Sequence, residues 1–139
     1  MAKAARPKPP PTLYPKRTPK VGSVMRSAYY VADSLDFVWK YSSAVIAWAP
    51  DDQPTQQQIE SVLDDFESMT FAGLDDPSRY CWSAIQHRDG DGVHIHIIAA
   101  RVDLETGKSY NPAPPGWQQP YDKLRDYYNV KHGWAEPEA

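Results

Sequence analysis

Three of the four histidines in this chain fall within ten residues, at His87, His94 and His96. His94 and His96 stand two apart in an apolar, β-branched run, so on a strand both imidazoles would leave the same face of a sheet. A short turn would bring His87 back beside them. Three imidazoles from two neighbouring strands leave coordination positions open, as a catalytic metal requires. The spacing therefore predicts an open-sided metal site.

The residues alone leave a simpler interpretation open, since histidines at alternate positions can also form an ordinary polar strand face. If a metal binds, softness alone favours Zn, Mn, Fe, Ni or Cu over Mg for three neutral imidazoles. An oxygen ligand from a substrate would change that order. Asp89 and Asp91 are either turn formers or partners that hold a histidine tautomer. We assign the functional role to Asp89 and the turn role to Asp91.

The histidines must be positioned by a hairpin. Residues 79–87 and 93–102 are rich in β-forming residues, and the segment between them has two glycines and two aspartates in five residues. That composition is typical of a tight turn between antiparallel strands. Ile95, Ile97 and the other odd positions of the second strand would then face the core.

Other segments predict the rest of the fold. A short helix is expected between Gly22 and Tyr41, and a strand over Ser43–Ala49, ended by Pro50. Thr55 and Gln58 form a capping-box pattern, followed by apolar residues at helical spacing up to Gly73. These residues are Ile59, Val62, Leu63, Phe66 and Met69. A closing helix over 117–129 would turn Leu124 and either Tyr127 or Tyr128 inward. We expect an α+β domain, with a central antiparallel sheet of about four or five strands and helices covering one face.

Composition adds limits. The 139 residues suffice for one domain, and residues 1–21 read as a disordered, basic, Pro-rich arm before a domain over 22–139. The arm is either a solvated tail or a segment that attracts nucleic acid electrostatically before the domain binds it. The rest of the chain is acidic, which is unusual for a protein that binds duplex DNA. Cys81 alone cannot form an intramolecular disulfide, and no segment has the length and apolarity of a membrane span, so we expect a cytoplasmic protein.

The stretch from Gln86 to Ile97 resembles the third motif of plasmid mobilization relaxases, which belong to the HUH endonuclease superfamily. That motif reads His-x-Asp, four residues, then His-hydrophobic-His, and the spacing here matches without a gap. Weaker similarity extends over residues 22–134, although Ala100 stands where family members often carry Asn. The resemblance implies an HUH-type nickase fold and a relaxase-like catalytic domain over 22–139. Because the substrate of such a domain supplies a phosphodiester oxygen to the metal, we expect a divalent ion, Mg or Mn, with Zn as the alternative.

The resemblance also implies a tyrosine nucleophile near the N-terminus, in a Tyr-hydrophobic-x-Asp context. Tyr30-Val31-Ala32-Asp33 fits that context, so Tyr30 is the expected nucleophile and Tyr29 the alternative. The implied reaction is site- and strand-specific nicking and rejoining of single-stranded DNA at a plasmid transfer origin. It proceeds through a 5′-phosphotyrosyl intermediate. Accessory relaxosome proteins are possible partners.

Two rival hypotheses remain. Another HUH enzyme, such as a replication initiator or a transposase, usually has its tyrosine after the histidines. The candidates for that tyrosine are Tyr121, Tyr127 and Tyr128. The second rival is a non-catalytic accessory protein that keeps the fold and binds DNA or a partner.

Overall fold

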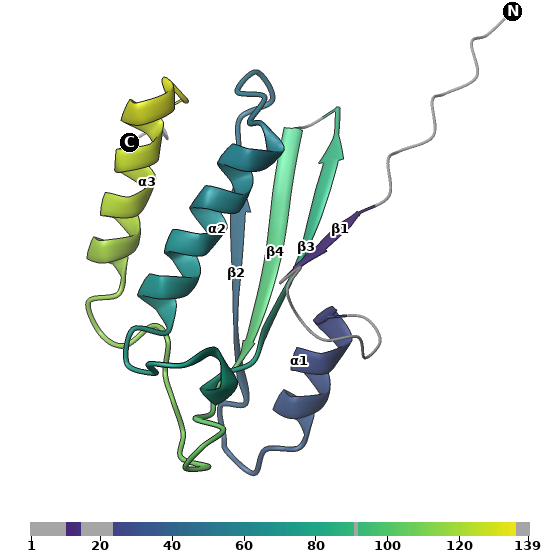
Figure 1. Cartoon of the computed structure of the whole chain (residues 1–139), viewed down its shortest axis with the longest axis vertical. Helices are drawn as coiled ribbons and strands as arrows, with labels where there is room; N and C mark the ends of the chain where they lie inside the picture. Colours follow the sequence, from purple (N-terminus) through teal and green to yellow (C-terminus); the bar gives the residue numbers. More distant parts are fainter. Residues whose placement is uncertain (1–10, 15–23, 91, 136–139) are drawn as a thin grey trace, which may run out of the picture.

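A computed structural model describes residues 11–14, 24–90 and 92–135, with the backbone alone for residues 24–27. The elements, in chain order, are β1 Thr12–Tyr14, α1 Val24–Asp33, β2 Tyr41–Ala47, α2 Gln56–Thr70, a 3-10 turn Pro77–Arg79, β3 Trp82–Asp89, β4 Gly92–Ala100 and α3 Gln118–His132. Figure 1 shows α2 and α3 side by side at one side of the molecule and α1 at the other.

The strands form one antiparallel sheet in the order β1-β3-β4-β2. The hairpin β3–β4 is at its centre, with Asp89 paired to Gly92 at the hairpin end. β2 runs antiparallel to β4 along the other side of that strand. The expected hairpin is confirmed, although β3 continues two residues past His87 and β4 begins one residue before Val93. At their outer ends, β3 starts three residues later and β4 ends two residues earlier than the sequence suggested. Asp91 lies outside the described residues.

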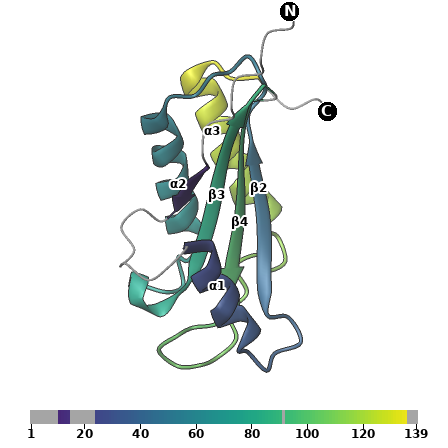
Figure 2. The same cartoon turned by 90° about the vertical axis from the view of Figure 1, so that its right-hand side faces the viewer.

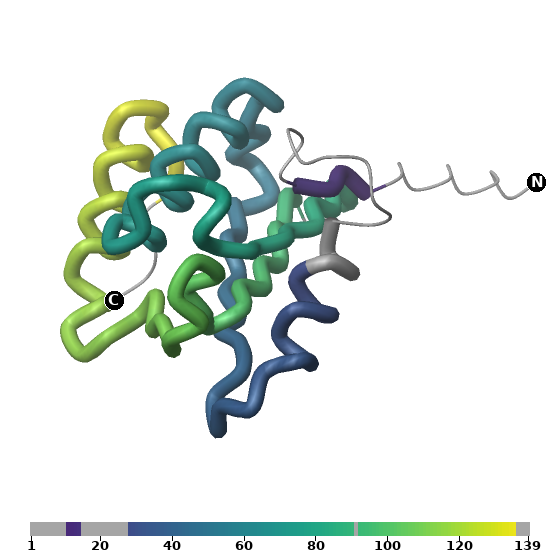
Figure 3. The backbone as a smooth tube through the Cα atoms, turned by 60° about the horizontal axis from the view of Figure 1, so that its bottom comes forward, coloured from purple at the N-terminus to yellow at the C-terminus, as the bar shows by residue number. Residues whose placement is uncertain are grey.

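The two faces of the sheet carry different residues. On the core face, Val93, Ile95 and Ile97 of β4 join the main buried cluster together with Ile59 and Phe66 of α2. The histidines project from the opposite face, which we call the histidine face. α1 packs on this second face, because its Ala32 clusters with Ala100 of β4 rather than with the main core. Figures 2 and 3 show α1 separated by the strands from α2.

The fold class is confirmed as α+β with a four-stranded antiparallel sheet. The expectation that helices cover one face is wrong in one respect, since α1 covers part of the other. The small side chains of Ala28 and Ala32, both almost fully buried, let α1 approach the strands closely.

Local signals explain α2 and α3. Thr55 caps α2 by accepting the N–H of Gln58, whose side chain accepts the Thr55 N–H in return, so the predicted capping box is present. α3 ends where Gly133 adopts φ 68°, a left-handed conformation that favours glycine. Tyr128 is the inward tyrosine of the two predicted candidates, and Tyr127 is exposed.

β1 lies within the segment 1–21 that the sequence analysis predicted to be a disordered arm. Residues 1–10 and 15–21 of that segment lie outside the described residues. β1 is held by Tyr14, which is buried and donates to Oε1 of Gln86 at 2.5 Å. Gln56 of α2 donates to the same tyrosine oxygen and accepts from Gln86 Nε2 at 3.1 Å. A buried polar network of this kind connects distant segments, and local sequence patterns do not reveal it.

Candidate active site

The register of the hairpin places the three histidines together. His87 on β3 is directly opposite His94 on β4. His96 lies two residues further along β4, between Ile85 of β3 and Val45 of β2. Residues directly opposite on neighbouring strands have Cβ atoms about 5 Å apart. All three imidazoles therefore leave the histidine face near the turn end of the hairpin, as the spacing predicted.

The site is open to solvent. His87 and His96 are exposed and His94 is half-buried. The rings of His87 and His96 lie 6.0 Å apart, centroid to centroid, and their planes are inclined by 70°. Among the described residues, no three His, Cys, Asp or Glu side chains are grouped closely enough to hold a metal ion. The donor types suit a divalent metal, but the imidazoles would have to rotate for three nitrogens to converge.

Asp89 lies on the histidine face too, because it is two residues after His87 on β3. Its side chain is half-buried. It lies at the turn end of β3, where it is paired with Gly92. Asp91, which we predicted to be a turn residue, lies outside the described residues.

The two expected nucleophiles sit on α1, and α1 packs against β3 and β4 on the histidine face. Tyr29 is 60% exposed and Tyr30 is 58% exposed. The helix thus brings an N-terminal tyrosine pair to the same side of the sheet as the histidines. Sequence periodicity predicted the helix but not the face that it covers.

The later tyrosines are on α3, which packs against α2 on the core face. Tyr128 is buried and donates to Asp65 Oδ2 at 2.5 Å and to the Ser61 carbonyl at 3.1 Å. Burial, followed by the hydrogen bond to Asp65, raises the pKa of Tyr128 above its usual value. The hydroxyl of Tyr121 bonds to Thr70 at 2.9 Å. These tyrosines serve packing on the side of the sheet away from the histidines.

Six acidic residues of the domain lie on helices away from the histidines. α2 and α3 carry Glu60, Asp64, Asp65, Glu67, Asp122 and Asp126. These helices lie on the core face, whereas the residues of β2 that share the histidine face are Tyr41, Ser43, Val45 and Ala47. The strand nearest His96 on that side is therefore uncharged. The acidic side chains of α2 and α3 are therefore on the other side of the sheet from this part of the surface, whereas Asp89 shares the histidine face.

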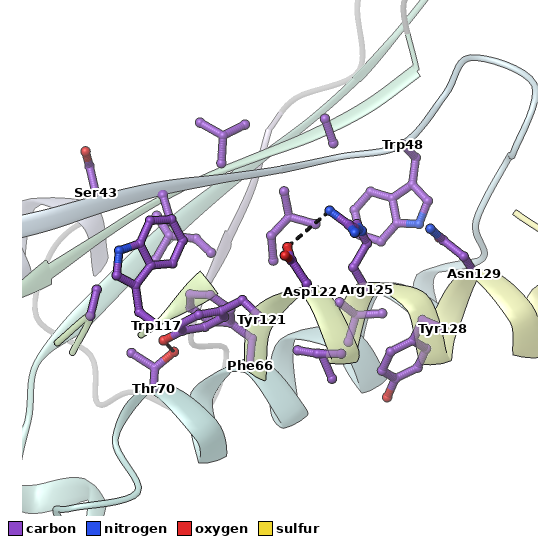
Figure 4. Close-up of a pocket in the computed structure, with 18 of the residues that line it drawn as sticks. Ser43, Trp48, Phe66, Thr70, Trp117, Tyr121, Asp122, Arg125, Tyr128 and Asn129 are labelled. Atoms are coloured by element: carbon purple, nitrogen blue, oxygen red, sulfur yellow. Dashed lines mark hydrogen bonds and ion pairs between the residues drawn. The ribbon is translucent and has the colours of Figure 1, made fainter. Parts of the chain in front are cut away.

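A cavity of about 650 Å³ lies elsewhere, between β2, α2 and α3. Figure 4 shows Trp48, Trp117 and Tyr121 around it, with Arg125 paired to Asp122 at 3.2 Å. None of the histidines on the described strands lines this cavity. The cavity is a largely apolar space at the edge of the sheet. The three hairpin histidines lie on another surface.

The family model described as "Relaxase: MobA/VirD2-like, nuclease domain" matches residues 38–134. The chain belongs to the MobA/VirD2-like relaxase family. The match includes the hairpin with all three histidines of this relaxase domain and begins after α1, so Tyr29 and Tyr30 precede it. The family that the histidine motif suggested is thus confirmed.

Two curated relatives are similar to this relaxase chain. Cryptic plasmid protein C of Neisseria gonorrhoeae is 28% identical over 111 residues, which cover 76% of the chain and 51% of that protein. DNA relaxase MbeA of Escherichia coli is 26% identical over 108 residues, which cover 77% of the chain and 20% of that protein. The chain therefore spans about half the length of the first relative and a fifth of the second. No solved structure matches it. No helix in the described ranges is both long and apolar enough to cross a membrane.

Sequence reasoning missed the neighbours that β2 supplies to the site. Val45 is the direct cross-strand neighbour of His96, and Ala47 that of His94. The alternation of exposed and half-buried residues along β2 was visible as a β-rich run, but the pairing partner of that run was not. Strand order is set by long-range packing, so a single sequence gave no signal for it.

Proposed function

We propose that this domain nicks and rejoins single-stranded DNA at a plasmid transfer origin, with site and strand specificity and with a divalent metal. The supporting observation is that three histidines, near the turn end of the hairpin, lie on the same face of the sheet that carries the tyrosine helix α1. Family membership supports nuclease chemistry at that face. The relative named as a DNA relaxase supports the same reaction class.

Tyr30 is the proposed nucleophile. Its phenolic oxygen attacks the scissile phosphorus, an O–P bond to tyrosine forms, and the bond from phosphorus to the 3′ oxygen breaks. The phenolic proton is lost to solvent or a nearby base, and the departing 3′ oxygen gains a proton. The products are a 5′-phosphotyrosyl link and a free 3′-hydroxyl. Attack by that hydroxyl reverses the reaction, so rejoining requires no nucleotide cofactor.

His87, His94 and His96 are the proposed metal ligands, with Mg or Mn as the expected ion and Zn as the alternative. A bound divalent ion would polarise the phosphate oxygen and stabilise the charge that develops on it. The histidines hold their positions through the paired backbones of β3 and β4. Asp89 orients an imidazole from the same face, as carboxylates beside metal-binding histidines commonly do.

A single strand is the proposed substrate, because attack by the tyrosine on one strand requires an accessible phosphodiester. Accessory relaxosome proteins that expose the origin are the proposed partners. The rival in which the nucleophile follows the histidines is disfavoured by Tyr128, which is buried on the core side of the sheet.

A cleavage assay tests the proposal. The substrates are single-stranded oligonucleotides that tile the transfer origin of the replicon encoding this chain, labelled in turn at each end. With Mn²⁺ we expect a free 3′-hydroxyl fragment and a protein-linked 5′ fragment from one strand only. Cleavage should disappear with EDTA and in His94→Ala. Failure of the wild-type protein to cut any of these oligonucleotides would reject the proposal in favour of the accessory-protein alternative.

A further inference from the structure

β2 extends the histidine face as an uncovered strip. Val45 is paired with His96, and the side chains of Ser43 and Tyr41 follow on the same face at two-residue intervals. All three are exposed. We call the residues Tyr41, Ser43 and Val45 the β2 strip.

The β2 strip stays open because of where α1 packs. α1 contacts β1, β3 and β4, and its buried Ala32 meets Ala100, the residue paired with Tyr41. Tyr41 thus lies beside the helix yet remains 52% exposed, and Val45 is 59% exposed. Figure 2 shows α1 over the lower part of the sheet, with β2 at the outer edge.

The chemistry of the β2 strip suits bases more than it suits a charged ligand. It contains an aromatic ring and an aliphatic side chain, and no charged group. Trp39, two residues before Tyr41, is 70% exposed, and the intervening Lys40 is exposed as well. Aromatic rings bind single-stranded nucleic acid by stacking on bases, and lysine neutralises the backbone phosphates.

We propose that Tyr41, assisted by Trp39, stacks on bases of the single strand that crosses the site at His96 and then follows the β2 strip. This inference rests on the proposed function, because it takes the same strand as ligand. Tyr41 is four strand residues from Val45, which corresponds to roughly 13 Å. At about 3.4 Å or more per nucleotide, the stacked base lies within about four nucleotides of the scissile phosphate.

The test measures recognition of bases separately from cleavage. Fluorescence anisotropy in EDTA and fixed salt compares an oligonucleotide of about 20 thymidines with an equally long abasic one. We expect the wild-type protein to bind the thymidine strand roughly 10- to 100-fold more tightly. Tyr41→Ala should lose most of that preference, while Tyr41→Phe, which keeps the ring, should retain it. Affinity for the abasic strand should change little in either variant.

Tyr127→Ala is the matched control, since Tyr127 is similarly exposed, at 56%, but lies on α3. It should keep the wild-type preference, and thermal melts verify that each variant is folded. A Tyr41→Ala protein with an unchanged preference for bases would overturn the inference, as would a wild-type protein with no preference. Because metal is absent, these outcomes do not depend on nicking. If the wild-type protein nicks DNA and the Tyr41→Ala variant keeps its preference for bases, the stacking role is rejected and the proposed function stands.

Discussion

His87 and His94 are directly opposed on β3 and β4, so the backbone register of one hairpin sets the spacing of the candidate metal ligands. A shift of one residue in that register would turn His94 and His96 into the core and bring Ile95 to the surface. The fully buried Ile95 opposes such a shift, because it anchors the core face of the same strand. The core and the site are therefore specified by the same alternation along β4.

Loss of one ligand should remove most of the catalysis. His94→Ala or His96→Ala should lower the nicking rate with Mn²⁺ by at least about 100-fold, because several kcal/mol of charge stabilisation depend on the bound ion. Titration calorimetry should show weakened Mn²⁺ binding in the same variants. Normal nicking by both variants would contradict the assignment.

His132 offers the matched control for these variants. It lies on α3, with its ring 4.6 Å from that of Trp134 and Nδ1 3.2 Å from Gln58 Nε2. His132→Ala should retain both nicking and Mn²⁺ binding while it lowers the melting temperature, because it removes packing at the end of α3. Any loss of metal binding in this variant would show that the histidine effect is not specific to the hairpin.

The hairpin end depends on a glycine. Gly92 has φ 104°, and a Cβ at this position would lie 2.9 Å from the Trp48 carbonyl oxygen. Gly92→Ala should lower the free energy of unfolding by about 1–3 kcal/mol, measured by urea denaturation. Gly90→Ala is the control, since a Cβ there meets no atom within 4 Å. Equal stability of the two variants would contradict this account of the turn.

The hairpin and α2 could be predicted because their signals are local. Alternation fixed the face of His94 and His96, and the capping box at Thr55 fixed the start of α2. β1 could not be predicted, since its three residues owe their position to the long-range bonds of Tyr14. The face covered by α1 and the place of β2 beside β4 also depend on contacts distant in sequence. The predicted strand Ser43–Ala49 therefore began two residues late and ended two residues late.

Tyr128→Phe separates a packing tyrosine from a nucleophile. The variant should nick at the wild-type rate, because the hydroxyl of Tyr128 is engaged with Asp65 and Ser61 on the core side. It should lose about 1 kcal/mol of unfolding free energy, the usual contribution of a buried hydrogen bond. Parallel nicking and denaturation measurements check both expectations. Abolished nicking in a folded Tyr128→Phe protein would favour the rival with a late nucleophile.

Stability at low pH should depend on Asp103. Arg79 donates to this carboxylate at 2.6 Å and holds the pKa of Asp103 well below its usual range. A depressed folded-state pKa stabilises the native protein above the unfolded-state pKa of roughly 4 and loses that contribution as the pH falls. Asp103→Asn should therefore melt at a lower temperature at neutral pH and approach the wild type in acid.

Asp75→Asn is the control for this pH dependence. Asp75 also pairs with Arg79, at 2.9 Å, but its side chain is 86% exposed, against 10% for Asp103. Solvent screens exposed ion pairs, so this variant should follow the wild-type melting curve from neutral to acid pH. If the two variants behave alike, the buried pair is not the source of the effect.

The most direct test of the central claim is mass spectrometry of the protein–DNA adduct. After reaction with a transfer-origin strand and Mn²⁺, nuclease and trypsin digestion should leave a nucleotide on the peptide of residues 27–40, which carries both α1 tyrosines. Fragmentation should place it on Tyr30, and Tyr30→Phe should form no adduct while Tyr29→Phe still does. A nucleotide attached to Tyr121, Tyr127 or Tyr128, or an undiminished adduct in Tyr30→Phe, would contradict the account.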